Sequence, residues 1–440
     1  MMSGADTPSG ALRRSQAAQT AFMAVPARTR QLALRSIAAS ILGDVDALAS
    51  MIVREGVKTI REARREVERA AETFFVAAEE AVRSTGETVD MERTAAGDGR
   101  WGHWERRPLG TVLAVTPYND PLNLVAHKVA PAIAVGCPII VKPHEATPGP
   151  AHRIAEYAAL TTLPDGTVTI VEGGPDVVRA LASDDRVRMV SFTGGARAGR
   201  AVAEAAGAKR IALELGGIGA SYVHADAAID RAAERLASGI VWAAGQNCVH
   251  TQHVVVHEEI ADELVSALVR RLEAMHCGDR MYDLTDIARQ ISVDAASGIE
   301  RLVDDAVAAG ATILARVRCD DPETVGPCLL TDVPADHPVA THEVFGPVAV
   351  LTRVAGLEEA VERVRALGPS INTSIFSDSL SAVRRWDLAI DAGTTIVNDS
   401  TDFRVDHMPF GGNGNAGIGR EGVRYAMEAM TERHMIVFAA

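Results

Sequence analysis

The sequence has few cysteines and no paired-cysteine motif. Only five cysteines occur in 440 residues, and none of them forms a Cys-x-x-Cys pair. An odd number without that spacing indicates neither a disulfide framework nor a zinc site, so we expect reduced thiols. The 13 histidines are scattered along the chain, and no metal site is predicted. The five cysteines are Cys137, Cys248, Cys277, Cys319 and Cys328.

Basic runs and long apolar runs are also missing. The net charge of -14 is spread along the chain, which lacks the positive stripe of a nucleic-acid binder. The longest uncharged apolar stretch is the 13 residues 129–141, and prolines and a glycine interrupt it, so no membrane span is predicted. The first 16 residues lack the apolar core of a secretory signal, and we expect a cytoplasmic protein.

What is present is a pattern typical of two α/β domains. Residues 11–84 carry apolar side chains at helical spacing, and from residue 112 short apolar runs alternate with Ala-rich helical segments. This alternation predicts βαβ units and a mostly parallel sheet. After Gly217 the rhythm restarts, which indicates a second α/β domain. Residues 99–110 and the terminal "RHMIVFAA" fit neither pattern, and each is predicted to form an edge strand at which subunits pair.

The segment "GQNC" raises the question of what Cys248 does. A free cysteine is usually a small buried apolar residue, and by itself this one fits that description. The alternative is a nucleophile, and the rest of the chain has to decide between the two.

Two segments that follow predicted strands suggest a nucleotide site. "SFTGG" ends a strand at Thr193, and its glycines would let a phosphate approach the N-terminus of a helix predicted near Ala196. Lys142 and Glu145 follow another strand, where open α/β sheets bind ligands and a carboxylate can accept ribose hydroxyls. The alternatives are a tight strand-to-helix turn and a solvated Lys-Glu pair.

Two further polar residues sit where catalytic groups are expected. Glu214 lies in the apolar run "RIALELGG", and burial should raise the pKa of its carboxyl toward that of a general base. Asn119 stands between two prolines in "TPYNDPLN", where a rigid backbone could aim its amide at an oxyanion. A structural Glu and an ordinary turn Asn remain open alternatives.

Taken together, the motifs resemble the aldehyde dehydrogenase superfamily. They are "TPYNDPLN", "KPHE", "FTGG", "LELGG", "GQNC", "EVFGPV" and "MPFGG" with "GIGREG", all in the family's order. The resemblance implies a Rossmann-type parallel-sheet domain, a second α/β catalytic domain and a small oligomerisation element. On this basis we expect residues 1–88 and 109–216 to bind the cofactor, 217–415 to form the catalytic domain, and 89–108 with 425–440 to pair subunits as a homodimer or homotetramer.

The resemblance also implies roles for individual residues. Cys248 would attack the aldehyde, Asn119 would hold the oxyanion, and Glu214 would activate the water that hydrolyses the thioester. The cofactor would be NAD, because Glu145 would repel a 2′-phosphate, although relatives with this Glu sometimes also use NADP. The expected cofactor-binding residues are Thr116, Pro117, Tyr118, Lys142, His144, Glu145, Thr193, Gly194, Gly195, Leu215, Gly216, Glu343 and Phe345.

The expected substrate is a small polar aldehyde, neutral or anionic, because the stretch "SDSTDFRVDHMPFGG" resembles members that handle lactaldehyde, succinate semialdehyde or phosphonoacetaldehyde. By analogy the residues lining its tunnel are Asp120, Leu124, His127, Asn247, Val249, Arg404 and Phe410. This polar set does not suit long alkyl or aromatic chains. The guanidinium of Arg404 could anchor an acid group, whereas Asp120 would oppose one. An ion pair between Arg404 and Asp402 is the structural alternative.

The chain departs from the family's pattern in two places, and two rival functions stay open. Relatives usually begin with further residues that form small strands, and their absence would leave a sheet edge bare. Gly195 stands where relatives often carry Ser. The rivals are a catalytically silent nucleotide-binding homologue and a thiol hydrolase that pairs Cys248 with His250.

Overall fold

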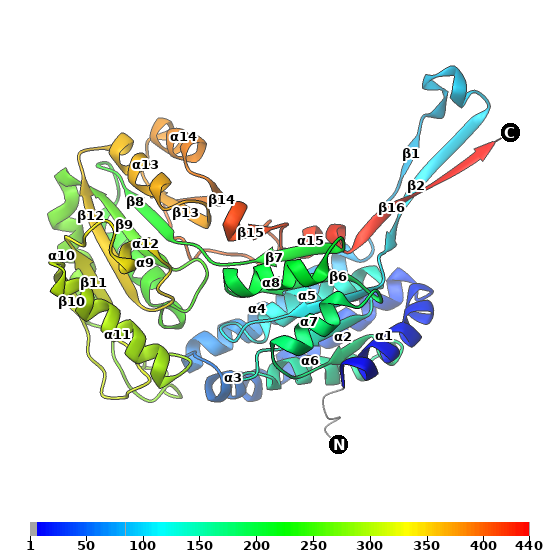
Figure 1. The fold of residues 1–440 in the computed structure, drawn as a ribbon, viewed down its shortest axis with the longest axis horizontal. Coiled ribbons are helices and arrows are strands. Elements are labelled where there is room, and N and C mark those ends of the chain that lie inside the picture. Colours follow the sequence, from blue (N-terminus) through cyan, green and yellow to red (C-terminus); the bar gives the residue numbers. More distant parts are fainter. Residues whose placement is uncertain (1–6, 84, 440) are drawn as a thin grey trace.

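The computed structural model describes residues 7–83 and 85–439, which form two α/β lobes and a projecting arm (Figure 1). Residues 1–6 of the N-terminal stretch that we expected to lack a signal, and Ala440 of the expected terminal strand, lie outside the described residues. The three parts correspond to three separate sheets, of six, seven and three strands.

The first lobe begins with four helices, of which the second and fourth pack against a buried central helix, and the first contributes to the apolar cluster on the other face of the six-stranded sheet. The fourth helix starts with a capping box, in which the Thr59 hydroxyl accepts from the Glu62 backbone and the Glu62 carboxylate accepts from the Thr59 backbone. Its apolar face, with Val67 and Phe74 fully buried, packs into the core. The elements are α1 (Pro8–Met23), α2 (Ala27–Gly43), α3 (Val45–Glu55), α4 (Ile60–Glu80), α5 (Asn123–Val135), α6 (Gly149–Ala159), α7 (Pro175–Ser183) and α8 (Ala196–Ala206).

The six-stranded sheet has the order β15-β7-β6-β3-β4-β5, and only its edge strand β15 is antiparallel. The chain runs from β3 outward through β4 and β5, then returns to the other side of β3 for β6 and β7. This reversal between β3 and β6 is a topological switch point, the place where open α/β sheets bind ligands. The strands are β3 (Thr111–Val115), β4 (Ile139–Lys142), β5 (Val168–Ile170), β6 (Val187–Thr193), β7 (Arg210–Glu214) and β15 (Gly417–Ile418).

The second lobe is built on a seven-stranded sheet of order β10-β11-β12-β9-β8-β13-β14, antiparallel only at β10. Helices cover both of its faces, with separate apolar clusters beneath them. Its strands are β8 (Gly219–Val223), β9 (Thr251–His257), β10 (Thr312–Arg316), β11 (Cys328–Thr331), β12 (Val348–Val354), β13 (Ser370–Phe376) and β14 (Ala392–Val397). Its helices are α9 (Ile229–Val241), α10 (Ala261–Glu273), α11 (Val293–Ala308), α12 (Pro338–Thr341), α13 (Leu357–Ala366) and α14 (Leu380–Ala389), and α15 (Val423–Ala429) returns to the first lobe against α5.

The arm joins two segments that are far apart in the sequence. Strand β2 (Arg100–Pro108) pairs antiparallel with β16 (Thr431–Ala439) along its whole length, and β1 (Glu87–Val89) adds a third strand. Trp101 and Phe438 are stacked on the arm with ring centroids 4.2 Å apart, and both are exposed. Both predicted edge strands therefore exist, and they pair with each other.

The expected helical opening is confirmed. The strands that the sequence predicted at the short apolar runs from residue 112 onward are confirmed as well. The sequence did not predict β8, β11 or the short strands β1 and β15. β8 begins with Gly-Ala-Ser, which has weak strand propensity, and β11 is only four residues long. No single described helix is both long and apolar enough to cross a membrane, and the adjacent pair α2 and α3, which together reach that composition, is bent by 74°.

Candidate active site

Two hollows lie at the carboxyl ends of the first lobe's strands: residues of both lobes line one of them, and residues of the first lobe alone line the other. One, here called the reaction cavity, has a volume of about 400 Å³, and the other, the adjoining cleft, has about 480 Å³. They share part of their walls: Pro117, Tyr118, Thr193, Gly194 and Gly195. These residues follow β3 and end β6, so the switch point of the sheet is the meeting place of the two hollows.

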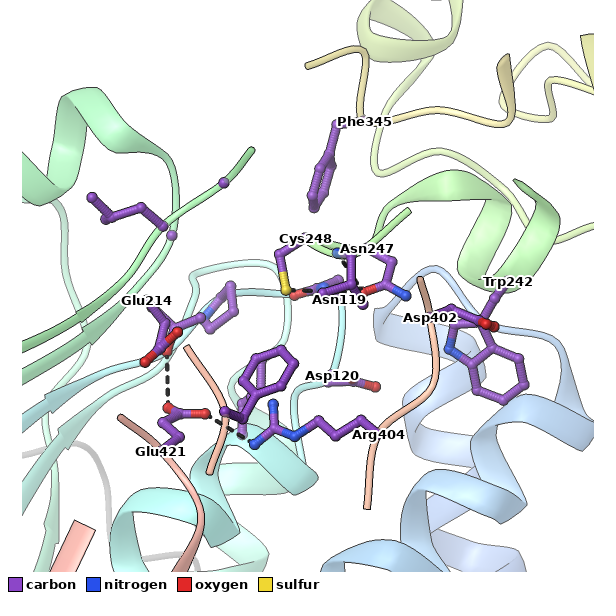
Figure 2. A pocket seen from close by; sticks show the side chains of 18 of the residues that line it. Asn119, Asp120, Glu214, Trp242, Asn247, Cys248, Phe345, Asp402, Arg404 and Glu421 are labelled. Atoms are coloured by element: carbon purple, nitrogen blue, oxygen red, sulfur yellow. Dashed lines mark hydrogen bonds and ion pairs between the residues drawn. The ribbon is translucent and has the colours of Figure 1, made fainter. Parts of the chain in front are cut away.

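Cys248 lies on the wall of the reaction cavity, partly exposed, in the loop between α9 and β9 (Figure 2). Its Sγ lies 3.9 Å from Oδ1 of Asn247, whose oxygen also accepts from the Val249 backbone. Burial raises the pKa of the Cys248 thiol to about 12, with the surrounding carboxylates adding to the effect and Arg404 opposing it. At neutral pH the side chain is therefore a thiol in this arrangement, and a base or an added positive charge is needed to form the thiolate.

The loop that carries Cys248 is held in an unusual backbone conformation. Ala243 and Ala244 have φ values of 51° and 52°, a left-handed region that costs alanine of order 1 kcal/mol or more. The Glu62 carboxylate accepts from the Ala243 backbone at 2.8 Å, and the Gln290 amide donates to the Ala244 carbonyl at 3.1 Å. Side chains from α4 and from the second lobe thus impose the conformation from both sides.

Asn119 lies opposite this loop, buried at the end of the β3 segment. Its Nδ2 donates to the Gln246 carbonyl at 3.0 Å, which uses one of its two N–H groups and fixes the plane of the amide. Figure 2 shows Asn119 and Asn247 beside Cys248. The amide is therefore adjacent to the thiol, as an oxyanion donor requires.

Glu214 ends β7 and is 2% exposed, and neither carboxylate oxygen has a hydrogen-bond partner among the described residues. Burial raises the pKa of its carboxyl well above the usual value, and the neighbouring Glu421 raises it further. Glu421 is stabilised as an anion, because its oxygens lie 2.7 Å from Lys128 Nζ and 3.1 Å from Arg404 Nη2. Its own pKa is accordingly lowered. Because the two carboxyls interact, their pKa values move in opposite directions. Glu421 is charged, and Glu214 is able to exchange a proton.

Arg404 is held by partners that the sequence did not suggest. Its Nη2 contacts Glu421 and lies 3.1 Å from Nε2 of His127, and its guanidinium carbon is 3.8 Å from the centroid of the Phe410 ring. The expected ion pair with Asp402 does not form, since Asp402 instead accepts from Ser400 and lies 3.8 Å from Arg235. Arg404 is on the cavity wall, but its charge is offset by Glu421.

Of the seven side chains expected to line the substrate tunnel, His127 is the one that does not. It is 1% exposed and lies behind Arg404, with Nε2 2.8 Å from Asp406. The other six are on the cavity wall: Asp120, Leu124, Asn247, Val249, Arg404 and Phe410. His250 is also off the wall, and burial lowers its pKa to about 4, so the geometry does not support a Cys-His hydrolase pair.

The sequence did not single out several cavity residues that come from distant segments. Arg65 and Arg69 project from α4, Trp242 and Arg235 come from α9 and the turn after it, and Glu421 precedes α15. A signal was present in α4, where Glu62, Arg65, Glu66 and Arg69 recur at i, i+3, i+4 and i+7 on one helical face. Glu421 stood in the quoted motif "GIGREG" without an assigned role.

The adjoining cleft has the features of a dinucleotide site. The N-terminus of α8 begins at Ala196, directly after Gly194 and Gly195, and carries backbone N–H groups without side-chain caps. Lys142 is 8% exposed and forms no hydrogen bond or ion pair with the described residues. Burial lowers the pKa of its ammonium, and Glu145 opposes the shift. A buried ammonium without a partner is costly, which fits a site for hydroxyl or phosphate oxygens. Thr116, His144 and Glu145 complete the wall.

The remaining expected cofactor residues lie where the cleft meets the reaction cavity. The Glu343 carboxylate packs against Gly216, where an added Cβ would collide with it. Phe345 has a φ of 52° and makes an edge contact with Tyr118 at a centroid distance of 6.2 Å. Leu215 packs on Gly199, which explains why the first turns of α8 need a glycine there. All thirteen expected positions thus lie on the two hollows.

One expectation about the cysteines is wrong. Cys277 and Cys319 form a disulfide, with their Cα atoms 5.7 Å apart and a sequence separation of 42. An odd count excludes only the pairing of every cysteine, and the sequence could not show that the segment after α10 and the segment after β10 lie side by side. Cys137, Cys248 and Cys328 are free.

Comparisons with known proteins agree with this geometry. A model of the aldehyde dehydrogenase family matches residues 2–436. The chain is 39% identical over 429 residues to aspartate-semialdehyde dehydrogenase 1 of Pseudomonas canavaninivorans, covering 97% of this chain and 90% of that protein.

Two solved structures share the fold. Aldehyde dehydrogenase 21 from Physcomitrella patens in complex with the reaction product succinate has a TM-score of 0.95 and 35% identity, covering 98% of this chain and 90% of that chain. Glyceraldehyde-3-phosphate dehydrogenase GapN from Methanocaldococcus jannaschii complexed with NADP has a TM-score of 0.93 and 31% identity, covering 99% and 96%. The chain belongs to the aldehyde dehydrogenase family and is an NAD(P)-dependent aldehyde oxidoreductase.

Proposed function

We propose that this protein oxidises a small, acid-bearing aldehyde to the carboxylic acid through a covalent bond to Cys248. The observation that carries the proposal is the meeting of a thiol, an amide donor and a buried carboxyl with a raised pKa on one cavity wall. This wall adjoins a cleft suited to a dinucleotide. Bound there, oxidised nicotinamide would supply the hydride acceptor.

Cys248 acts first as the nucleophile. Its Sγ forms a bond to the carbonyl carbon while its proton passes to the Glu214 carboxylate, whose raised pKa makes it a better acceptor than an ordinary Glu. The carbonyl oxygen becomes an oxyanion, which the free N–H of Asn119 and the Cys248 backbone N–H stabilise. The tetrahedral carbon can then lose hydride, which leaves a thioester on Cys248.

Glu214 acts again when the thioester is hydrolysed. After the proton taken from Cys248 has passed to solvent, Glu214 takes a proton from water as the water oxygen attacks the acyl carbon. The C–S bond then breaks, the acid leaves, and the Cys248 thiolate regains a proton. Glu421 remains charged, since Lys128 and Arg404 hold its pKa low, and it keeps the affinity of Glu214 for a proton high. The fixed negative charge of Glu421 thus helps to keep the pKa of Glu214 raised.

The residues of the adjoining cleft favour NAD as the cofactor, and NADP is the second candidate. Lys142 and Glu145 are positioned to hold the adenosine ribose, and a carboxylate there would repel a 2′-phosphate. Gly194, Gly195 and the N-terminus of α8 would take the pyrophosphate, and Glu343 with Phe345 would take the nicotinamide end.

The substrate side favours an anionic aldehyde of a few carbons. The names of the similar proteins refer to aspartate semialdehyde, succinate and glyceraldehyde 3-phosphate, all of which are acids. The cavity of about 400 Å³ is lined by four arginines: Arg65, Arg69, Arg235 and Arg404. We propose the same substrate class for this chain.

We also propose a division of the chain into domains and an oligomeric state. Residues 1–88 and 109–216 would bind the cofactor, 217–415 would form the catalytic domain, and 89–108 with 425–440 would join subunits in a cytoplasmic homodimer or homotetramer. Sedimentation of the full chain tests the assembly: a monomer at micromolar concentration would contradict it.

The direct test is NADH or NADPH formation, followed by absorbance, with the full chain and a panel of short aldehydes. We expect turnover with at least one acid-bearing aldehyde and weaker turnover with uncharged aldehydes of equal length. Absence of turnover with every aldehyde, alongside measurable NAD binding, would instead support a catalytically silent nucleotide-binding homologue.

A further inference from the structure

The four arginines that line the reaction cavity differ in whether their charge is already paired with a carboxylate of the protein. Arg69 donates to both oxygens of Asp406, at 3.2 and 2.8 Å, Arg235 pairs with Asp399, and Arg404 pairs with Glu421. A guanidinium bound to a carboxylate in this way has little left to offer a ligand acid. Arg65 is the exception, because it forms no ion pair with any residue that the structure describes.

Arg65 is nevertheless held in place. Its guanidinium carbon lies 5.1 Å from the centroid of the Trp242 ring, and the side chain is exposed at the cavity. Stacking on an indole fixes the plane of the guanidinium and leaves its N–H groups free to donate. Arg65 is therefore an oriented cation on the cavity wall that makes no ion pair with a described residue, although its charge also acts on Asp402 of the same wall.

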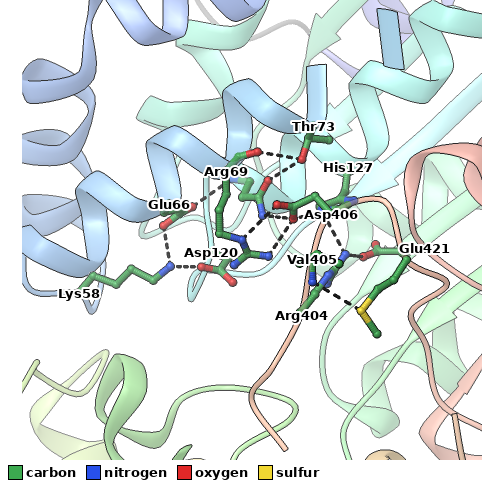
Figure 3. Close-up of polar contacts among 12 residues, drawn as sticks. Lys58, Glu66, Arg69, Thr73, Asp120, His127, Arg404, Val405, Asp406 and Glu421 are labelled. Carbon is green, nitrogen blue, oxygen red and sulfur yellow. Dashed lines mark hydrogen bonds and ion pairs between the residues drawn. The ribbon is translucent and has the colours of Figure 1, made fainter. Parts of the chain in front are cut away.

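A second charged group sits near the same ring. Asp120 lines the cavity, and one of its oxygens pairs with Nζ of the fully buried Lys58 (Figure 3). Lys58 also pairs with Glu66 at 2.8 Å, and its Nζ lies 5.8 Å from the Trp242 centroid. Trp242 thus contacts both cations, which brings Asp120 and Arg65 into one part of the cavity.

The charges of Lys58, Glu66 and Asp120 do not cancel. One ammonium faces two carboxylates, so the group of Lys58, Glu66 and Asp120 keeps a formal charge of −1. The Glu66 carboxylate is further occupied by the backbone N–H groups of Leu122 and Asn123, at 2.7 and 3.0 Å. Asp120, with a side chain 21% exposed, is therefore the member that presents an acceptor to the cavity.

We propose that Arg65 and Asp120 select an aldehyde that carries an acid group and, next to it, a hydrogen-bond donor, either an ammonium or a hydroxyl. The inference rests on the proposed function and adds a specificity to it. The acid pairs with the guanidinium of Arg65, and the donor pairs with the carboxylate of Asp120. Lys58 holds the Asp120 carboxylate in place, so that a group that would oppose an acid instead accepts a hydrogen bond from the donor beside it.

Three four-carbon aldehydes of nearly equal shape test the proposal. They are 4-oxobutanoate, which lacks a donor, 2-hydroxy-4-oxobutanoate and 2-amino-4-oxobutanoate. The measurement is kcat/KM of the full chain with saturating NAD. We expect at least one donor-bearing substrate to exceed 4-oxobutanoate by about tenfold or more, because a charge-assisted hydrogen bond contributes that much. The rank of the other two shows whether ammonium or hydroxyl is the natural donor.

The variants D120N and R65M separate selectivity from structure. D120N keeps an oxygen for Lys58 and should reduce the ratio of kcat/KM for the amino substrate to kcat/KM for 4-oxobutanoate to about threefold or less. R65M should lower kcat/KM for each of the three acids about tenfold or more relative to kcat/KM for butanal with the same variant. A residue with a purely structural role would lower all four substrates together.

Arg64 provides a matched control, because it lies one residue away on α4 and pairs outward with Asp46 and Asp283. R64M removes the same charge and should leave the substrate ranking unchanged. If the wild type oxidises the three acids with equal kcat/KM, or D120N keeps the preference, the selectivity is overturned while the proposed function stands. If no aldehyde gives NADH, both are overturned.

Discussion

The adjoining cleft and the reaction cavity share a wall but are built in different ways. The cleft is made of strand ends, two glycines and a helix N-terminus, with Lys142, Glu145 and Arg179 as its charged groups. The cavity is made of side chains from α4, α9 and the segments 399–421, and most of its charges are paired with one another. The cleft recognises its ligand mainly through backbone geometry, whereas the cavity depends on which charge remains unpaired after folding.

The largest effect is expected from replacing Cys248. It tests whether the thiol serves the reaction cavity without contributing to ligand binding in the adjoining cleft. Cys248→Ala should lower kcat/KM by about 10⁴-fold or more, because the covalent route is lost. Binding of NAD, measured by fluorescence titration, should stay nearly unchanged, since the cleft does not use Cys248. Cys328→Ala, which changes a buried free cysteine in the second lobe, is the matched control and should remain active. Turnover by Cys248→Ala would contradict the role of the thiol.

A smaller effect is expected at the base. Glu214→Gln should lower the steady-state rate by about 10² to 10⁴-fold, because general base catalysis contributes that much. A burst of NADH should survive if hydrolysis is the step lost, and stopped-flow absorbance would detect it. A steady rate equal to that of the wild type would show that another group activates water.

The same carboxyl predicts the pH dependence. Glu214 works in its deprotonated form and its pKa is raised, so activity should be lost as pH falls through that raised value, well before an ordinary carboxyl would protonate. Cys248, with its pKa raised to about 12, adds to the same trend, and kcat/KM should rise from neutral to alkaline pH. Glu214→Gln should flatten the acid limb. An acid limb that is unchanged in the variant would assign it to a different group.

On the cleft side, the charge of Glu145 should decide between the two dinucleotides. Glu145→Gln removes a like charge from the site of a 2′-phosphate, so the ratio of kcat/KM for NAD to that for NADP should fall about tenfold. Glu172→Gln, which changes an exposed carboxylate paired with His152, is the control. An unchanged ratio would mean that Glu145 does not face the adenosine ribose.

The smallest effect on activity is expected far from both hollows. Cys277→Ser removes the disulfide, and a cross-link across 42 residues is worth about 2–4 kcal/mol through the unfolded chain. The thermal midpoint should therefore fall, while kcat/KM stays within about a factor of two. A large loss of activity at unchanged stability would show that the cavity depends on this segment.

Sequence motifs predicted the cleft more completely than the cavity. Lys142, Glu145 and Gly194 follow strands whose apolar runs are visible in the sequence, and the ends of neighbouring parallel strands must meet at one edge. The partners in the cavity could not be predicted in that way. Arg404 was expected on the tunnel wall, where it lies, with an ion pair to Asp402 as the alternative, but its carboxylate partner is Glu421. His127 was expected on the wall and lies behind Arg404.

The sequence by itself predicted most of the order of the elements, and it singled out the candidate thiol, amide and buried carboxyl. These depend on local periodicity and on motifs that keep their spacing. Tertiary structure decided the charge balance: Lys58 at Asp120, Glu421 beside Glu214, the free guanidinium of Arg65 and the bond between Cys277 and Cys319. The reason is physical, since the pKa and the pairing of an ionisable group depend on desolvation and on neighbours within a few ångströms, and folding brings those neighbours from distant parts of the chain.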